Sequence, residues 1–428
     1  MIRIHAHKPA WQQHHRRRTR LALRTVNLGV KRHAVPFVAH GLVVLRPTHH
    51  PQVGNPRAVL GVRRTRLACH QQPARPQQHP ASHRRLRRQD TRWQAQGVHS
   101  HPMHLFTWRA MGTEFTLYLP DSEREWAVGV AGELQEETRR LERQLSLYLP
   151  DSDLCYLNAH AHLQPVRVEP ELFHLLQTCQ SLYALTQGAF DPTVTPLLRL
   201  WGFVDKQYRV PDPDAIEQAL ERVGMELVLL EPSGCWVYYA LSGVELSFGA
   251  IGKGWAIAQC LRILRELGVA NALLDAGGST LYALGTPADF ESTPSLRFPL
   301  QAGGTEFERF PSRSGGNLQE GGNTSHAQSG WLVRLPDGSE VRLQDAALAV
   351  AGDTEQYFEV NGVRYGHIID PRTGYPAPSR PPVAVIGDDP TLCDALSTAL
   401  YIEPALESIV RTRCRSVSVS TAIDGCGK

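Results

Sequence analysis

The chain has 428 residues, enough for two or three domains and for at least one sizeable hydrophobic core. Its formal net charge of +3 hides an uneven distribution, because residues 1–102 hold 20 of the 45 Lys and Arg residues and a single acid. The remainder is acidic overall, and no stretch is apolar and long enough to predict a membrane span, which argues against a helical membrane protein.

Residues 1–102 differ in character from everything that follows Met103. They contain 13 of the 19 histidines and basic runs such as Arg84-Arg85-Leu86-Arg87-Arg88, and they lack the periodicity that would bury a core. We predict that this segment is disordered or a spurious extension, translated from a start codon placed too early. A basic arm for phosphate backbones is the alternative, but the segment has few aromatic residues and no nucleic-acid-binding motif, so no nucleic-acid partner is expected.

From Met103 the predicted elements alternate between strands and helices. Residues 106–119 form two strand pieces with an irregular joint at Met111-Gly112-Thr113, and 124–145 form an amphipathic helix. Ser152 is a good helix N-cap. A helix over about 170–187 ends at Gly188, and another runs from Asp212-Pro213 to Gly224.

The second half continues with strands at 227–230, 236–239 and 244–248. A glycine-rich turn at 249–254 opens a helix, a buried strand follows at 272–275, and the last predicted helix contains Leu392 and Leu400. Residues 303–330 are rich in Gly, Ser and Asn and predict a flexible surface insertion. Because the chain shows no regular βαβ run, we predict an α+β fold with mixed or antiparallel sheets in two closely packed subdomains and the site between them.

The eight cysteines are scattered and include no Cys-x-x-Cys pair. This spacing argues against a disulfide framework or a zinc site and suits a reducing compartment. No secretory signal or lipid-accepting cysteine is visible at residue 1 or before Met103. We therefore expect a cytoplasmic protein whose cysteines mostly fill the core.

The turn at residues 365–376 is the most polar short span of the chain. It places His367, Asp370, Arg372 and Thr373 between turn residues, and such a turn can hold several polar groups near one ligand. The alternative is an ordinary hairpin tip with solvated charges.

Two glycine-rich turns, at 249–254 and 277–280, resemble phosphate cradles, in which small residues let backbone N–H groups approach an anion. Neither matches a Walker A loop or a dinucleotide-binding fingerprint, and a lone glycine turn is more often structural. Lys253 favours a functional interpretation of the first turn, because a cation at a helix start opposes the helix dipole unless an anion lies nearby.

Asp394 and Thr398 stand four residues apart on the last predicted helix, so they share one face. A carboxylate and a hydroxyl suit Mg²⁺, which takes few protein oxygens and completes its shell with water and phosphate. The alternative is a structural Asp near the helix start with a Thr bonded to its own backbone.

Taken together, these segments resemble the ApbE family of FAD:protein FMN transferases. The resemblance covers about 105–403 and rests on motifs in family order: MGTEF, SLYLPDSDLCYLN, GAFDPTVTPLLRLWGF, LSFGAIGKGWA, NALLDAGGS, YGHIIDPRTGYP and DALSTAL. It implies an enzyme that binds FAD and Mg²⁺, transfers FMN to a threonine hydroxyl of a target flavoprotein and releases AMP. Two alternatives remain: an FAD pyrophosphatase that gives FMN and AMP, and a non-catalytic FAD-binding protein.

The resemblance also implies roles for single residues. The residues that would line the FAD site are Met111, Tyr148, Ala189, Phe190, Asp191, Ser247, Lys253 and Ile368. Mg²⁺ would be held by Asp394, Thr398 and the carbonyl of Ala250. We hypothesise that His367 is the general base, because imidazole titrates near neutral pH, and that Asp370 orients it or assists the metal site.

Three departures from the family pattern stand out. Ser247 replaces an acid that contacts FAD, so affinity or nucleotide preference is expected to differ. Many members carry a lipoprotein signal, which is not visible here. Residues 404–428 form an atypical tail beyond the predicted catalytic domain (103–403), because their sequence is unlike the strand ending that the family pattern implies; a frameshift or truncation would explain the difference.

Overall fold

The computed structural model describes residues 103–120, 122–286, 296–297, 330–335, 339–353, 356–414 and 416–421. All of these lie within one compact unit, Val98–Lys428. The predictions for residues 1–102, and for all but the last residue of the insertion at 303–330, fall outside the described residues.

A seven-stranded antiparallel sheet forms the centre of the described chain. In spatial order its strands are β1 (His104–Ala110), β2 (Thr113–Leu119), β6 (Ala272–Ala276), β7 (Thr280–Leu284), β11 (Ala346–Ala351), β14 (Val383–Gly387) and β15 (Ser418–Thr421). The predicted joint between the first two strands is confirmed. It is a two-residue turn with both residues at positive φ, 53° at Met111 and 72° at Gly112.

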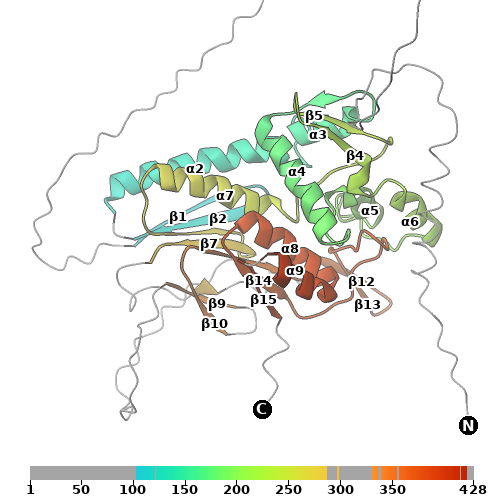
Figure 1. Ribbon diagram of the computed structural model, residues 1–428. Helices are drawn as coiled ribbons and strands as arrows, with labels where there is room; N and C mark the ends of the chain where they lie inside the picture. The colour runs from blue at the N-terminus through green and yellow to red at the C-terminus, as the bar shows by residue number, and fades with distance from the viewer. Residues whose placement is uncertain are drawn as a thin grey trace, which may run out of the picture. The chain divides into compact units, whose positions relative to one another are not determined.

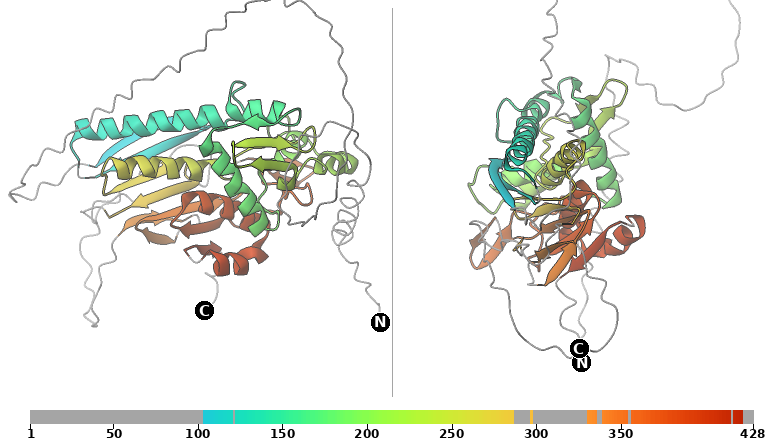
Figure 2. Two further views of the ribbon diagram at one scale, coloured as in Figure 1. Left: turned by 45° about the horizontal axis from the view of Figure 1, so that its top comes forward. Right: turned by 90° about the vertical axis from the view of Figure 1, so that its left-hand side faces the viewer.

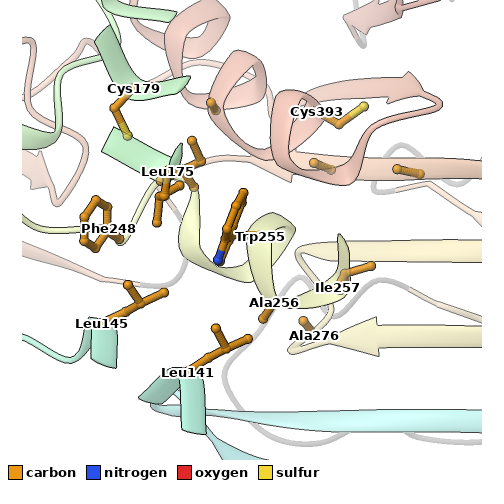
Figure 3. Packing of buried hydrophobic residues seen from close by; sticks show 14 of the residues in the cluster. Leu141, Leu145, Leu175, Cys179, Phe248, Trp255, Ala256, Ile257, Ala276 and Cys393 are labelled. Atoms are coloured by element: carbon orange, nitrogen blue, oxygen red, sulfur yellow. The ribbon is translucent and has the colours of Figure 1, made fainter. Parts of the chain in front are cut away.

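Three helices cover one face of this sheet: α2 (Arg124–Leu145), α7 (Gly252–Glu266) and α8 (Pro390–Ile402). They lie side by side over the strands in both views of Figure 2. Figure 3 shows how α2 and α7 meet the sheet, with Leu141, Trp255 and Ile257 in the shared core. Each buried leucine of this kind contributes roughly 1.5–3 kcal/mol of hydrophobic stabilisation.

The opposite face of the sheet is covered by a small three-stranded sheet. Its strands are β8 (Leu296–Arg297), β9 (Trp331–Arg334) and β10 (Glu340–Leu343). Trp331 and Val333 pack against Leu273 and Leu281, whereas the neighbouring Leu274 faces the helices. Successive side chains of a strand point to opposite faces, and β6 is apolar apart from Asp275 because both of its faces are covered.

The segments between α2 and α7 build the second part of the fold. The helices are α3 (Asp153–His160), α4 (Pro170–Leu185), α5 (Thr195–Leu200) and α6 (Pro213–Leu220), with the short turns η1 (Pro192–Val194) and η2 (Met225–Leu227). The strands β3 (Val166–Arg167), β5 (Trp236–Tyr239) and β4 (Val228–Glu231) form a separate antiparallel sheet. The predicted two-part α+β fold is thus confirmed. No described helix has the length and apolarity needed to cross a membrane.

Residues 244–248 do not form the predicted strand. The Asn158 side chain bonds both the N–H and the carbonyl of Leu246, at 2.9 and 3.0 Å, and the N–H of Ser247 donates to the carbonyl of Pro192. These partners satisfy the backbone groups that a sheet ladder would otherwise use, so the apolar segment stays irregular.

The segment predicted as an atypical tail, residues 404–428, contains the last strand of the main sheet. After α8 the chain forms η4 (Pro404–Leu406), α9 (Glu407–Arg413) and β15, and β15 pairs antiparallel with β14 from Val383↔Thr421 to Ile386↔Ser418. Val417 and Val419 are buried. The strand therefore extends the main sheet despite its serine-rich sequence.

The six described cysteines are free thiols. Cys179, Cys260 and Cys393 are buried, and burial raises the pKa of each thiol well above its usual range. As predicted for most cysteines of the chain, these three pack as small apolar residues.

Gly254 allows α7 to cross close to α8. A Cβ atom there would lie 2.2 Å from the carbonyl oxygen of Pro390 and 2.8 Å from Cβ of Asp394. We expect Gly254→Ala to lower the free energy of unfolding by about 1–3 kcal/mol, because the helices must separate. Urea denaturation measures the change.

The matched control is Gly132→Ala in α2, where a Cβ atom meets nothing within 4 Å. This variant should gain about 0.4–1 kcal/mol, because alanine restricts the unfolded chain. If Gly254→Ala left the free energy of unfolding unchanged or raised it, the close crossing of α7 and α8 would not explain this glycine.

Candidate functional site

A cavity of about 940 Å³ opens between the two parts of the fold. Its wall is built from the β1–β2 turn, the segment after α2, the loop before η1, the start of α7, the β6–β7 turn, the segment after β13 and α8. This volume lies at the upper end of small-molecule sites and suits a ligand as large as a dinucleotide.

Twelve of the thirteen residues singled out from the sequence line this one cavity. They are Met111, Tyr148, Ala189, Phe190, Asp191, Ser247, Ala250, Lys253, His367, Ile368, Asp394 and Thr398. Segments separated by more than 250 residues therefore converge on one site. The roles assigned to these residues stay predictions.

Asp394 is held in place by α7 and by β7. Its Oδ2 accepts the N–H of Gly254 at 2.9 Å, and its Oδ1 accepts the hydroxyl of Thr280 at 3.1 Å. Burial raises the pKa of the carboxyl, and the nearby Lys253 ammonium opposes that rise. A buried carboxylate at a cavity wall with lone pairs to spare is a suitable ligand for a hard cation.

The other two predicted metal ligands lie on the same cavity wall. Thr398 is one helical turn after Asp394 on α8, and Ala250 immediately precedes the start of α7. It is Ser397, not Thr398, whose hydroxyl bonds the helix backbone, at 2.8 Å from the carbonyl of Asp394. Among the described residues no cluster of three or more His, Cys, Asp or Glu could hold a metal.

Lys253 lies between two buried carboxylates. Its ammonium donates to the hydroxyl of Ser279, and it lowers the pKa of both Asp275 and Asp394. The predicted conflict between a lysine and the N-terminus of a helix is thus relieved by acids of the chain itself. The ammonium is at the cavity wall, where it can meet an anionic ligand.

Asp275 is a cavity residue that our sequence reasoning missed. It is the penultimate residue of β6, is 7% exposed, and accepts the N–H of Gly278 at 2.9 Å. Burial raises its pKa from 3.8 to about 7, with Glu114 adding to the rise and Gly278 and Lys253 opposing it. An acid at the end of a buried strand before a Gly-Gly turn is the signal that could have revealed it.

This raised pKa predicts how stability depends on pH. The folded state holds the proton of Asp275 more tightly than the unfolded state does. The protonated carboxyl therefore contributes fully to the free energy of unfolding below about pH 4, and this contribution is lost as pH rises through about 7. Asp275→Asn should be more stable than the wild type at pH 8, by up to about 4 kcal/mol at about 1.4 kcal/mol per pKa unit, and not at pH 4. Urea unfolding of both proteins at pH 4 and pH 8 measures the difference in stability. An equal difference at the two pH values would contradict the raised pKa.

His367 follows β13 (Val363–Gly366) directly. Its backbone N–H donates to the carbonyl of Gln356 at 3.0 Å, and its Nδ1 lies 3.1 Å from the same oxygen. When Nδ1 carries the proton for that contact, the neutral ring has its basic nitrogen at Nε2. Both residues line the cavity, so the imidazole is positioned for proton transfer there.

Asp370 occupies a different position from the one expected. Its carboxylate forms a two-pronged ion pair with Arg372, at 2.9 and 2.8 Å, and also accepts the backbone N–H of Arg372. The described cavity lining includes its neighbours Ile369 and Pro371 but not Asp370. The structure therefore gives Asp370 a place in the turn rather than beside the imidazole or the metal ligands.

The two aromatic residues of the predicted flavin site differ in exposure. Tyr148 is 71% exposed at the cavity, whereas Phe190 is 1% exposed and belongs to the core. Asp191, next to Phe190, accepts both the N–H and the hydroxyl of Thr193 through Oδ1, at 2.8 and 2.6 Å. Tyr148 alone offers a broad free face, and Phe190 and Asp191 mainly fix the loop.

Buried acids, a lysine and a histidine thus surround one cavity large enough for a nucleotide. The sequence model of the ApbE family matches residues 111–294 and 310–416. The chain therefore belongs to the ApbE family.

Known proteins similar to this chain agree with that assignment. The FAD:protein FMN transferase of Treponema pallidum (strain Nichols) is 32% identical over 286 residues, which cover 64% of this chain and 72% of that protein. The crystal structure of the ApbE protein from Thermotoga maritima aligns with a TM-score of 0.59 at 28% identity, covering 74% of this chain and 93% of that one. The apo flavinyl transferase ApbE of Pseudomonas stutzeri, at 24% identity and a TM-score of 0.60, supports the fold, covering 78% of this chain and 100% of that one.

Proposed function

We propose that the protein is a Mg²⁺-dependent transferase that moves the FMN moiety of FAD to a threonine hydroxyl of a target flavoprotein and releases AMP. The observation that carries the proposal is one cavity lined by His367, Lys253 and the pair Asp394 and Thr398. Similar proteins from Treponema pallidum, Klebsiella pneumoniae and Vibrio cholerae are named FAD:protein FMN transferases, which supports the reaction class.

The cavity is large enough for FAD and offers one lysine to its phosphates. The Lys253 ammonium is a compact cation that can meet a pyrophosphate oxygen, and the glycine pair at 277–278 leaves the β6–β7 turn open to close approach. A Cβ atom at Gly277 would lie 1.9 Å from the hydroxyl of Thr113, so that turn excludes larger residues. Tyr148 supplies an exposed ring for stacking on a flavin or an adenine.

The same wall fits Mg²⁺. Asp394, Thr398 and the carbonyl of Ala250 would hold the ion, and the raised pKa of Asp394 reflects a buried carboxylate that a cation would stabilise. When bound, the ion supplies charge neutralisation at the phosphoryl oxygens.

The chain's own residues account for the proton and the leaving group. The acceptor hydroxyl gives its proton to Nε2 of His367 as its oxygen attacks the phosphorus of the FMN half. The anhydride bond between the two phosphates breaks, and AMP leaves with the bridging oxygen. Lys253 stabilises the charge that gathers on the phosphates, and the proton on His367 passes to solvent.

The test uses the full chain with FAD, Mg²⁺ and a flavoprotein domain that has an acceptor threonine, followed by intact mass of the domain. A mass gain of one FMN that EDTA abolishes is expected. AMP and FMN released in solution with no gain on the domain would instead identify an FAD pyrophosphatase. FAD binding with neither product would identify a binding protein.

A further inference from the structure

The hairpin that leads into His367 stands apart from the three sheets of the fold. Strands β12 (Tyr357–Val360) and β13 pair only with each other among the described residues, through a two-residue Asn361-Gly362 turn with φ of 53° and 77°. In Figure 1 it lies outside the main sheet, below α5 and α6. An isolated hairpin is only marginally stable, so packing must support it.

Aromatic rings support one face of the hairpin near its base. The cross-strand pair Phe358 and Tyr365 stacks at 5.2 Å between ring centroids, and Tyr365 packs on Trp201 at 5.3 Å. Phe358 also stacks on Tyr208 at 5.3 Å and contacts Phe203 at 5.7 Å. The base of the hairpin is thus fixed against the second part of the fold.

The tip of the same face is uncovered. Val360 and Val363 are opposite one another across the strands and share a face with Phe358 and Tyr365, because side chains alternate along a strand. Val360 is 38% exposed and Val363 is 51% exposed. We call Tyr208, Phe358, Val360 and Val363 the hairpin strip.

The polar groups of the other face are already paired. Arg364 lies 3.6 Å above the Tyr357 ring and donates to the carbonyl of Asp353 at 2.8 Å. Glu359 is directly opposite Arg364 across the strands. The hairpin strip therefore offers an apolar surface, and a matching partner segment must itself be apolar.

The hairpin strip is continuous with the cavity. Phe203, which packs on Phe358, lines the cavity, and so do Gln356 and His367 at the two ends of the hairpin base. The hairpin strip is therefore next to the histidine that an acceptor hydroxyl would have to reach. By contrast, the comparably exposed Leu229 lies on the small sheet of β3, β5 and β4 and is not part of the described cavity lining.

We propose that the hairpin strip is the docking surface for the acceptor protein, and that it receives an apolar segment flanking the acceptor hydroxyl. The inference rests on the proposed function, which requires a protein to deliver its side chain to His367. The strip is much smaller than a stable interface, which suits a substrate that must leave after each turnover.

The test substitutes the most exposed residue of the strip. Val363→Glu should raise KM for the flavoprotein domain of the transfer assay by about tenfold or more, because a charge then faces an apolar partner segment. At saturating acceptor, kcat should stay within about twofold, and Kd for FAD should not change. Val363→Ile should behave like the wild type.

Leu229→Glu is the matched control, since it introduces the same charge at a similarly exposed residue, and it should leave KM unchanged. An unchanged KM in Val363→Glu, or an equal rise in Leu229→Glu, would overturn the docking surface. Transfer of FMN by the wild type tests the proposed function. The ratio of KM between Val363→Glu and the wild type tests docking, so a failure of one proposal can be told from a failure of the other.

Discussion

Replacing Asp394 with asparagine should reduce FMN transfer by about a thousandfold or more without destabilising the fold. The loss corresponds to about 4 kcal/mol of transition-state stabilisation, within the range for removing a metal ligand from a phosphoryl-transfer site. The asparagine carbonyl can still accept the N–H of Gly254, and its amide can donate to Thr280 after that hydroxyl turns. Transfer rates over a Mg²⁺ titration measure the loss of activity, and isothermal titration of Mg²⁺ measures the accompanying loss of metal affinity.

Stability separates this result from simple misfolding. Because burial raises the pKa of Asp394, the charged carboxylate is costly in the metal-free fold, and asparagine removes that cost. We expect the metal-free Asp394→Asn protein to melt at the same temperature as the wild type or higher. Asp388→Asn, an exposed change shortly before α8, should alter neither rate nor stability. Normal Mg²⁺ affinity in Asp394→Asn would contradict the assigned metal site.

The site was predictable because its chemistry lies in short local segments. The order of motifs from the β1–β2 turn to α8 identified twelve of the residues that line the cavity before any contact was known. The residues around Asp275 predict a buried strand, but they do not show that the pKa of this acid rises to about 7. Such a shift depends on partners such as Glu114 and Lys253, which are distant in sequence.

Errors arose where neighbours in sequence are not neighbours in the site. Asp370 stands three residues from His367, yet the turn between them directs its carboxylate to Arg372. The segment 244–248 has the apolar character of a strand, but the Asn158 side chain occupies its backbone groups. A side chain 88 residues away has no signature in local periodicity.

The C-terminal strand, by contrast, does have a local signature in the sequence. The sequence Ser416-Val417-Ser418-Val419-Ser420 alternates with a period of two, which is the pattern of a strand with one buried face. We nevertheless predicted residues 404–428 only as an atypical tail. The pairing of β15 with β14 and the burial of both valines follow directly from it.

Replacing His367 with alanine should lower FMN transfer by about a hundredfold to ten-thousandfold, the usual contribution of a general base. FAD affinity should hardly change, because the backbone N–H of residue 367 still bonds the carbonyl of Gln356. In the wild type, transfer should fall as pH decreases, since a protonated imidazole accepts no proton. That acid limb should be absent from the variant, and single-turnover rates between pH 5 and 9 measure it.

Two further variants distinguish a base from a general disturbance of the site. His160→Ala removes a half-buried imidazole that stacks on Tyr156 and is not part of the described cavity lining, and its rates should match the wild type. Asp370→Asn weakens the ion pair with Arg372, so it should lower the melting temperature and keep the acid limb. Full transfer by His367→Ala would remove the histidine from the mechanism. Loss of the acid limb in Asp370→Asn would return that carboxylate to it, because only a group coupled to the base alters the pH dependence.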